Sequence, residues 1–180
     1  GPSLEPESTW RKVGRPMTAP LLSERLPLGT GMLGRNIAAG LVHGARVSLL
    51  ISLVSTMVGL LLGVPIGALA GYAGGIVDDA LMRFTEFFQT IPSFALAIVL
   101  VAIFQPSLGS IVIAIGLVSW PPVARLVRGE VLSLRSREYV QAAVTLGQST
   151  PRIILSQILP NTVAPIIVMG SLLVASAILL

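Results

Sequence analysis

The sequence predicts an all-α, polytopic transmembrane helix bundle, and two observations carry this prediction. Of the 180 residues, 53% are apolar and 11% are charged, and the mean hydropathy is +0.87. A soluble domain carries about 25% charged residues, so this scarcity of charge indicates surroundings that do not hydrate ions. In addition, three long runs hold no charged side chain, at 47–77, 87–124 and 153–180. Runs of this length predict about four membrane spans in this stretch of chain.

Residues 1–46 precede the first predicted span. The first thirty of them are polar and proline-rich and follow neither a helical nor a strand period, which predicts an extended surface segment. The chain begins with Gly1 instead of Met, has no signal peptide, and stops at Leu180 inside an apolar run. We therefore expect a fragment of a longer membrane subunit.

The charge-free runs set the predicted spans. The first run contains a segment of 24 residues that is long enough to cross a hydrocarbon core of about 30 Å. The second run is too long for one crossing and is interrupted by turn-forming residues at 105–109, so it predicts two spans. The third run begins its span near Pro160. The predicted spans are about 47–70, 79–104, 108–126 and 160–180.

Single residues within or beside the spans have predicted packing and anchoring roles. Glycine and proline inside the spans indicate close helix contact and kinks; they are Gly59, Gly63, Pro65, Gly67, Pro92 and Gly116. Trp120 is expected as an aromatic belt residue, and Arg125 and Arg128 as anchors at the end of the third span. Asp78 and Asp79 are expected at the start of the second span, where the helix dipole favours anions.

The loops differ in charge, which predicts the orientation. The segment 125–152 holds five arginines, namely Arg125, Arg128, Arg135, Arg137 and Arg152, whereas the loop at 105–109 holds no charge. By the positive-inside rule, the arginine-rich segment is cytoplasmic. Counting crossings backwards places 105–109 outside, 71–86 inside and 1–46 outside. The last placement conflicts with six basic residues in 1–46, although the rule binds long polar segments less strictly.

Several kinds of chemistry are excluded or disfavoured. The chain has no cysteine, its single histidine, His43, stands alone, and it contains no HExxH or GxSxG motif. Lys12 is the only lysine and lies in no phosphate-binding loop, so the chain has no Walker A site for hydrolysing ATP. We expect no enzymatic activity, no metal and no bound cofactor. The net charge is +4, but no basic stretch is interleaved with aromatic residues. This pattern disfavours nucleic-acid binding.

Ionisable residues are missing from the middle of the predicted spans. Arg83, Glu86 and Arg125 lie near span ends. Ion-coupled carriers usually keep such residues at the membrane midplane, so a secondary transporter is disfavoured. An energy source outside this chain is therefore favoured.

The stretch 137–159 predicts a helical hairpin on the cytoplasmic face. Residues 138–146 form an amphipathic pattern, and Gly147 can adopt the left-handed conformation that ends a helix. Ser149 or Thr150 can then cap a second short helix, with Pro151 at its first position. This second helix covers 152–159 and is expected to stop at Pro160.

The pattern of this hairpin leaves two interpretations open. An amphipathic connector that lies on lipid headgroups shows the same alternation. A docking site for a soluble partner also fits, because small residues in its middle let another surface approach closely.

The same hairpin resembles the "EAA" loop of ABC importer permeases. The matching residues are Gln141, Ala142 and Ala143, then Gly147, and then Leu159, Pro160 and Asn161. Gln141 stands where the family usually has Glu. The resemblance implies that the hairpin couples the permease to its ATP-binding subunit. The residues implied at that interface are Glu138, Tyr139, Gln141, Ala142, Ala143, Leu146, Gly147, Ser149 and Arg152.

A second motif narrows the resemblance to dipeptide, oligopeptide and nickel permeases. It consists of Leu28, Gly29, Thr30, Leu33, Gly34 and Arg35, followed by the run from Gly44 to Leu49. Gly31 and Asn36 replace two aspartates usual in the family. Further matches are the run from Ala70 to Gly75 with Asp78, and Met82-Arg83 ahead of Ile91-Pro92-Ser93. The resemblance covers 28–180 and implies one span before this stretch and one after it.

The resemblance implies a multi-pass permease subunit of a binding-protein-dependent importer in the bacterial inner membrane. Di- and oligopeptides are the implied substrates, and nickel complexes are the alternative within the family. The implied partners are a second homologous permease, two ABC subunits that carry ATP and Mg, an extracytoplasmic substrate-binding protein and membrane lipid. The rival hypotheses are a channel or carrier that needs no nucleotide, and a membrane anchor that scaffolds a complex.

Overall fold

The computed structural model describes Leu28 and residues 37–179, and every regular element within these residues is helical. The chain divides into two units, 1–50 and 51–180. Leu28 is exposed. The other residues of the predicted extracytoplasmic motif lie outside the described residues; they are Gly29, Thr30, Leu33, Gly34 and Arg35. Gly31 and Asn36, which stand where the family usually has aspartate, also lie outside them.

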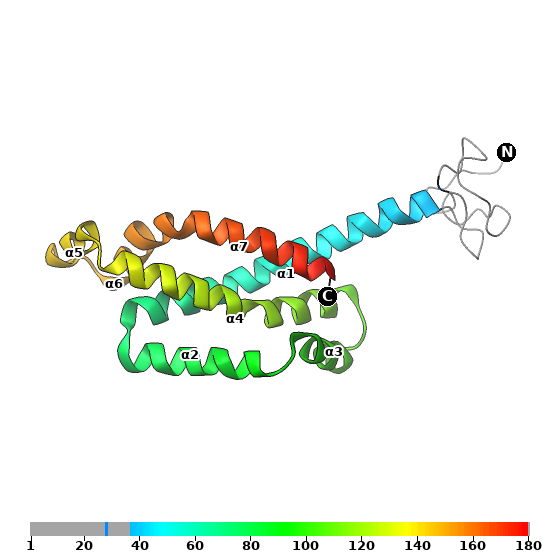
Figure 1. Cartoon of the computed structure of the whole chain (residues 1–180), viewed down its shortest axis with the longest axis horizontal. Helices are drawn as coiled ribbons and strands as arrows, with labels where there is room; N and C mark the ends of the chain where they lie inside the picture. Colours follow the sequence, from blue (N-terminus) through cyan, green and yellow to red (C-terminus); the bar gives the residue numbers. More distant parts are fainter. Residues whose placement is uncertain (1–27, 29–36, 180) are drawn as a thin grey trace. The chain divides into compact units, whose positions relative to one another are not determined.

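Helix α1 covers Ile37–Ala73 (Figure 1). Its 37 residues correspond to about 55 Å, which exceeds a hydrocarbon core of about 30 Å. The helix begins well before the predicted span at 47–70, because residues 37–45 are uncharged and contain no proline that would stop it.

The predicted span at 79–104 consists of two helices instead of one. Helix α2 covers Gly75–Thr90, helix α3 covers Ser93–Phe104, and the two are bent by 84° at the break between them. Pro92 stands at the N-cap of α3, and Ile91 before it is extended, with φ −83° and ψ 128°. Proline disfavours the helical conformation of the residue that precedes it, which accounts for the break.

Helix α4 covers Leu108–Arg135 and therefore extends beyond the predicted span at 108–126. Ser107 caps its start, since the Ser107 hydroxyl oxygen accepts a hydrogen bond from the backbone N–H of Ser110 at 3.1 Å. The extension puts Arg128 and Arg135 in the same continuous helix as Arg125.

Both helices of the predicted hairpin are present, but the prediction that the second helix ends at Pro160 is wrong. Helix α5 covers Glu138–Thr145, α6 covers Thr150–Ile153, a π-helical turn η2 covers Ile154–Ile158, and α7 covers Leu159–Leu179. These last three elements follow one another without a break, so the chain is helical from Thr150 to Leu179.

The π-turn explains how the helix passes Pro160. The backbone N–H of Leu159 donates to the carbonyl of Ile154, five residues earlier, which widens the turn just before the proline ring. The side-chain amide of Asn161 donates to the carbonyl of Gln157 at 2.7 Å. Proline is tolerated inside a helix where such local adjustments and side-chain bonds satisfy freed backbone groups.

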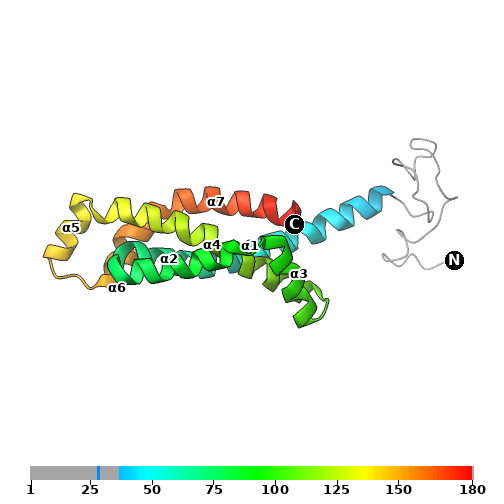
Figure 2. The same cartoon turned by 60° about the horizontal axis from the view of Figure 1, so that its bottom comes forward.

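Helix α4 is the centre of the second unit. It contacts α2, α3 and α7, and both views place it beside α2 and α7 (Figures 1 and 2). Val123, Val127 and Val131, spaced by four residues, form its fully buried stripe. The core cluster consists of Ala68, Val123, Val127, Val131, Val140, Ala143, Ile153, Ile158 and Leu173.

Glycines of α1 allow that helix to pack directly on the backbone of α4. A methyl group added at Gly63 would lie 2.7 Å from the carbonyl oxygen of Trp120, and one at Gly71 would lie 2.7 Å from that of Arg128. Gly67 faces the carbonyl oxygen of Ala124 in the same way. Small residues at four-residue spacing are typical of membrane helices in close contact, so the close contact predicted at Gly63 and Gly67 is confirmed, and Gly71 adds a third such position.

Three helical segments of the described chain are long and apolar enough to cross a membrane: Ile37–Ala73, Leu108–Arg135 and Thr150–Leu179. The bent pair of α2 and α3 adds a fourth if it is counted as one broken span. The predicted all-α membrane bundle is thereby confirmed.

Candidate functional site

Helices α5 and α6, with residues 146–149 between them, form an elbow at one end of the bundle (Figure 1). Gly147 adopts the left-handed conformation, with φ +76°. Its N–H donates to the carbonyl of Val144 at 2.9 Å, and the N–H of Gln148 donates to that of Ala143 at 3.1 Å. These two bonds make a Schellman motif, and the predicted end of the first helix at Gly147 is confirmed.

The second arm of the elbow starts as the sequence predicts, with one difference. Ser149 stands at the N-cap of α6, and its backbone carbonyl accepts from the N–H of Ile153 at 3.0 Å. Its hydroxyl makes no capping hydrogen bond, and Pro151 is the second residue of the helix instead of the first. The turn is therefore held by backbone bonds and by the restricted φ of proline.

The inner face of the elbow is part of the core. Val140 and Ala143 of α5 and Ile153 of α6 are buried there. Ala143 belongs to the set predicted for a partner interface, but its side chain is only 4% exposed and packs within this chain. This burial holds the elbow against the bundle.

The outer face of the elbow gathers the other predicted interface residues. They are Glu138, Tyr139, Gln141, Ala142, Leu146, Gly147, Ser149 and Arg152, and all are exposed. Leu146 at the tip is 80% exposed and Tyr139 is 41% exposed. Two charged residues, Glu138 and Arg152, belong to the same exposed set. An exposed apolar tip with a polar rim is typical of a surface that binds another protein.

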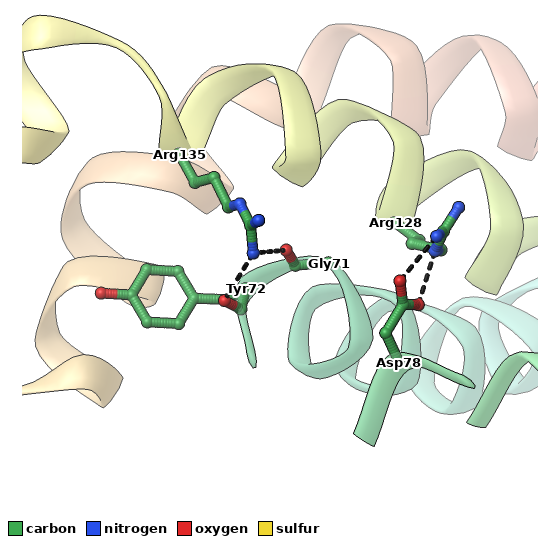
Figure 3. Close-up of polar contacts among 5 residues, drawn as sticks. All are labelled: Gly71, Tyr72, Asp78, Arg128 and Arg135. Atoms are coloured by element: carbon green, nitrogen blue, oxygen red, sulfur yellow. Dashed lines mark hydrogen bonds and ion pairs between the residues drawn. The ribbon is translucent and has the colours of Figure 1, made fainter. Parts of the chain in front are cut away.

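Arg135, the last residue of α4, joins the elbow to the end of α1. Its Nη1 donates to the carbonyl oxygens of Gly71 and Tyr72, each at 3.2 Å (Figure 3). Helix α1 ends at Ala73, so these carbonyls belong to its last turn, where partners within the helix run out and a cation is favourable. The backbone carbonyl of Arg135 in turn accepts a hydrogen bond from Nε2 of Gln141 at 2.9 Å.

These contacts connect α1, α4 and α5 through one residue. A hollow of about 400 Å³ lies beside them, lined by Tyr72, Arg135, Ser136, Val140, Gln141 and Val144. The sequence showed Arg135 only as one of five arginines that set the orientation. Its helix-capping role was missed, because no local spacing relates it to residues more than sixty positions earlier.

Arg128 and Asp78 form a second connection at this end of the bundle. The guanidinium donates from Nε and Nη2 to the two carboxylate oxygens, each at 2.6 Å (Figure 3). Asp78 lies in the first turn of α2, as expected for an anion near a helix start, but Gly74 is the N-cap residue and no side chain caps this helix. Arg128 therefore binds α2 rather than serving only as an interface anchor.

Trp120 differs from its expected role as a belt residue. It is only 3% exposed and packs between aromatic side chains of α2. Its ring lies 5.8 Å from that of Phe84 and 5.4 Å from that of Phe88, measured between centroids. Aromatic pairs at such distances are favourable, so Trp120 helps to hold α2 against α4.

Among residues 37–179, no group of three or more histidine, aspartate or glutamate side chains is close enough to hold a metal ion. The site consists instead of the elbow, its exposed outer face and the polar contacts that tie it to α1 and α2.

Comparison with known proteins supplies a family. The family model described as "Binding-protein-dependent transport system inner membrane component" matches residues 63–180. The match therefore includes α2 to α7, the elbow and the last part of α1.

Individual relatives are permeases. The dipeptide transport system permease protein DppC of Bacillus subtilis (strain 168) is 38% identical over 178 residues, which cover 99% of this chain and 55% of the relative. The di/tripeptide transport system permease protein DppC of Pseudomonas aeruginosa (strain UCBPP-PA14) is 42% identical over 155 residues, with coverage of 86% and 51%. The oligopeptide transport system permease protein OppC of Escherichia coli (strain K12) is 40% identical over 162 residues, with coverage of 90% and 54%. The chain thus spans about half the length of these relatives.

Proposed function

The chain belongs to the family of binding-protein-dependent transport system inner membrane components, and on this premise we propose that it is the permease subunit of an ATP-driven importer of di- and oligopeptides. As a member of that family with several apolar helices, it is a multi-pass protein of the inner membrane. The observation that carries the proposal is the elbow, a small helical hairpin whose inner face is part of the core and whose outer face is exposed.

In this proposal, each of two ATP-binding subunits docks on the elbow of one permease. A partner subunit is needed because this sequence has no Walker A site of its own. ATP and Mg belong to those subunits. A second homologous permease completes the path, and an external binding protein delivers the substrate. The elbow end of the bundle is then cytoplasmic, in keeping with its arginines.

The contacts of the elbow support a lever mechanism. Val140 and Ala143 are buried in the core, and the Schellman motif at Gly147 holds the two arms at a defined angle, so the elbow moves as a unit. Arg135 joins this unit to the last turn of α1, and the glycines of α1 lock that helix against α4. Closure of the ATP-binding subunits therefore tilts α1 and α4 together between outward-open and inward-open states.

The proposed substrate class follows from the relatives. Permeases named for dipeptides, di- and tripeptides and oligopeptides are 38–42% identical to this chain. A nickel complex is the alternative substrate, on the resemblance of the motif that begins at Leu28. Peptide amides can be hydrated by water in the path, so few charges are needed to admit them.

The test is reconstitution of the complete assembly in vesicles. We expect uptake of a labelled dipeptide that requires ATP, the binding protein and a copurified subunit with a Walker A motif. Uptake of a nickel complex without uptake of the dipeptide would favour the alternative substrate. Uptake that proceeds without ATP or without the ATP-binding subunit would identify a channel or carrier and contradict the proposal.

A further inference from the structure

Helix α2 between Asp78 and Glu86 and helix α4 between Arg125 and Arg128 together carry six charged side chains, at some distance from the elbow. Three are acidic and three are basic: Asp78, Asp79 and Glu86, and Arg83, Arg125 and Arg128. Within residues 37–179 the only ion pair is that between Arg128 and Asp78. Arg125 donates to the neutral side-chain amide of Gln89. The charges of Asp79, Glu86 and Arg125 are therefore not neutralised by an ion pair.

A hollow of about 390 Å³ lies between these charges. Asp79, Met82 and Glu86 of α2 border it on one side, and Arg125 and Arg128 of α4 border it on the other. Positions 79, 82 and 86 follow the helical spacing that puts side chains on one face. The space, which we call the charged hollow, therefore has an acidic edge on α2 and a basic edge on α4. Its volume lies in the range of sites for small molecules.

The charged hollow lies along α2 and α4 at a distance from the elbow, and its lining residues Asp79, Glu86 and Arg125 are exposed on this chain. Arg125 precedes the end of α4 at Arg135 by ten residues, or about 15 Å of helix. Glu86 follows the start of α2 at Gly75 by eleven residues, or about 16 Å. Charged side chains of membrane helices are unfavourable against lipid; they usually face a water-filled cavity or the interior of a bundle, and there they often mark the path of a substrate.

The walls of the charged hollow are held in place. The two hydrogen bonds from Arg128 to Asp78 tie α2 to α4, and Trp120 packs on Phe84 and Phe88 of α2. Arg125 is directed toward α2 by its bond to Gln89. Long arginine side chains often reach out to lipid headgroups, but here the guanidinium is turned across the groove between two helices.

We propose that the charged hollow is a subsite of the translocation path that binds the two charged ends of a short peptide. Glu86 takes the ammonium group, and the Arg125 guanidinium takes the terminal carboxylate. The Arg128–Asp78 pair serves as a fixed wall. Carboxylates recognise ammonium groups, and arginine recognises carboxylates through its fork of N–H donors. This inference rests on the proposed function in peptide import.

The test compares Glu86→Gln and Arg125→Gln with Arg83→Gln in the reconstituted assembly. Arg83→Gln is the matched control, because it removes an exposed charge of α2 close to Glu86 that does not border the charged hollow. Peptide uptake per ATP hydrolysed is measured with the binding protein saturated, so that delivery is not limiting. We expect a loss of about tenfold for each of the two hollow variants, the size expected when one charged contact of about 1.4 kcal/mol is removed. The control should stay within about twofold of the wild type, and all three should keep ATP hydrolysis that responds to the binding protein.

A second substrate tests which residue binds which terminus of the peptide. For a dipeptide acetylated at its N-terminus and loaded to the same occupancy of the binding protein, Glu86→Gln should have no further effect, whereas Arg125→Gln should still lower uptake. The assignment of Glu86 would be overturned if both variants lost uptake of the acetylated dipeptide equally. It would also be overturned if the wild type did not transport the acetylated dipeptide and Glu86→Gln transported the free dipeptide normally.

Other outcomes separate this inference from the proposed function. If the wild type takes up peptide with ATP and neither hollow variant loses uptake, the inference fails and the proposed function stands. Losses of the same size in Arg83→Gln would also overturn it, because they would show a general effect of charge. Losses confined to vesicles that contain phosphatidylethanolamine would assign the charged hollow to a lipid headgroup. Absence of ATP-dependent uptake by the wild type would contradict the proposed function itself, and this inference with it.

Discussion

Arg128 of α4 holds the carboxylate of Asp78 on α2 with two hydrogen bonds, each 2.6 Å long. Two parallel N–H to oxygen bonds fix the angle between the groups as well as their distance. The side chain of Asp78 is 10% exposed and that of Arg128 is 35% exposed, so water competes only weakly for the carboxylate. The pair fixes the first turn of α2, from which the bent helix pair α2 and α3 departs.

We expect Arg128→Lys to loosen α2 although it keeps the charge. A lysine ammonium cannot reproduce the fork of donors that matches a carboxylate. The free energy of unfolding should fall by about 1–3 kcal/mol, as for a largely buried polar group that loses a partner. Thermal unfolding of the purified subunit in detergent measures this change. Asp79→Asn is the matched control, since Asp79 is exposed and should leave the unfolding temperature unchanged.

Two glycines should respond to alanine with opposite signs. Gly63→Ala places a methyl group against the carbonyl oxygen of Trp120, so α1 must move away from α4 at a cost of about 1–3 kcal/mol. Gly129 of α4 has open space around it, and Gly129→Ala should stabilise the helix by up to about 1 kcal/mol. Unfolding curves of both variants check the prediction. Equal effects would show that α1 does not pack on α4 as closely as described.

Two substitutions at Gly147 distinguish the effect of backbone strain on the elbow from the effect of added bulk on docking of the ATP-binding subunit. Left-handed φ costs a side chain with a β-carbon about 1–2 kcal/mol, but asparagine tolerates it. Gly147→Leu adds both strain and bulk to the exposed outer face, so we expect loss of the ATP-binding subunit on copurification, or ATP hydrolysis without uptake. Gly147→Asn should retain more of both activities. Normal uptake and hydrolysis in Gly147→Leu would mean that the elbow is not the coupling element.

Arg135 should transmit the movement of the elbow to α1. Arg135→Gln removes the donor shared by the carbonyls of Gly71 and Tyr72, so the last turn of α1 loses its anchor. We expect lower uptake per ATP hydrolysed, together with faster amide hydrogen exchange at the end of α1. Arg137→Gln is the control, because Arg137 is exposed and its substitution changes the net charge equally. Coupling that is intact in both variants would exclude a transmitting role for Arg135.

Gln141 should hold α5 in place by donating a hydrogen bond to the backbone carbonyl of Arg135. An ionised glutamate at this position has no N–H or O–H with which to donate. Gln141→Glu keeps the shape of the side chain but removes the N–H that reaches the carbonyl of Arg135. The expected cost is about 1 kcal/mol, seen as faster amide hydrogen exchange in α5 relative to the wild type. The difference should shrink below about pH 4, where the acid is protonated and can donate again. A difference that persists there would point to another cause.

The sequence alone predicted much of this fold because the relevant information is local. Charge-free runs predicted the membrane bundle, since the cost of placing ions in lipid applies residue by residue. The glycine at position 147 allowed the end of the first elbow helix to be predicted, because few residues other than glycine adopt positive φ. Eight of the nine residues that the family resemblance implies at an interface are exposed, whereas Ala143 is buried in the core.

Only the tertiary structure decided the features that depend on distant partners. The kink predicted at Pro92 is present, but its size of 84° and the division of the span into two helices were not predicted. The stop predicted at Pro160 is wrong, because a π-turn precedes the proline and the chain stays helical. Arg128 meets Asp78 across fifty positions of sequence, and Arg135 meets α1 across more than sixty. Spacing rules act within a few residues of one helix, so they say nothing about which side chain of another helix lies opposite. That choice is made when glycines of α1 and the valine stripe of α4 pack the helices together.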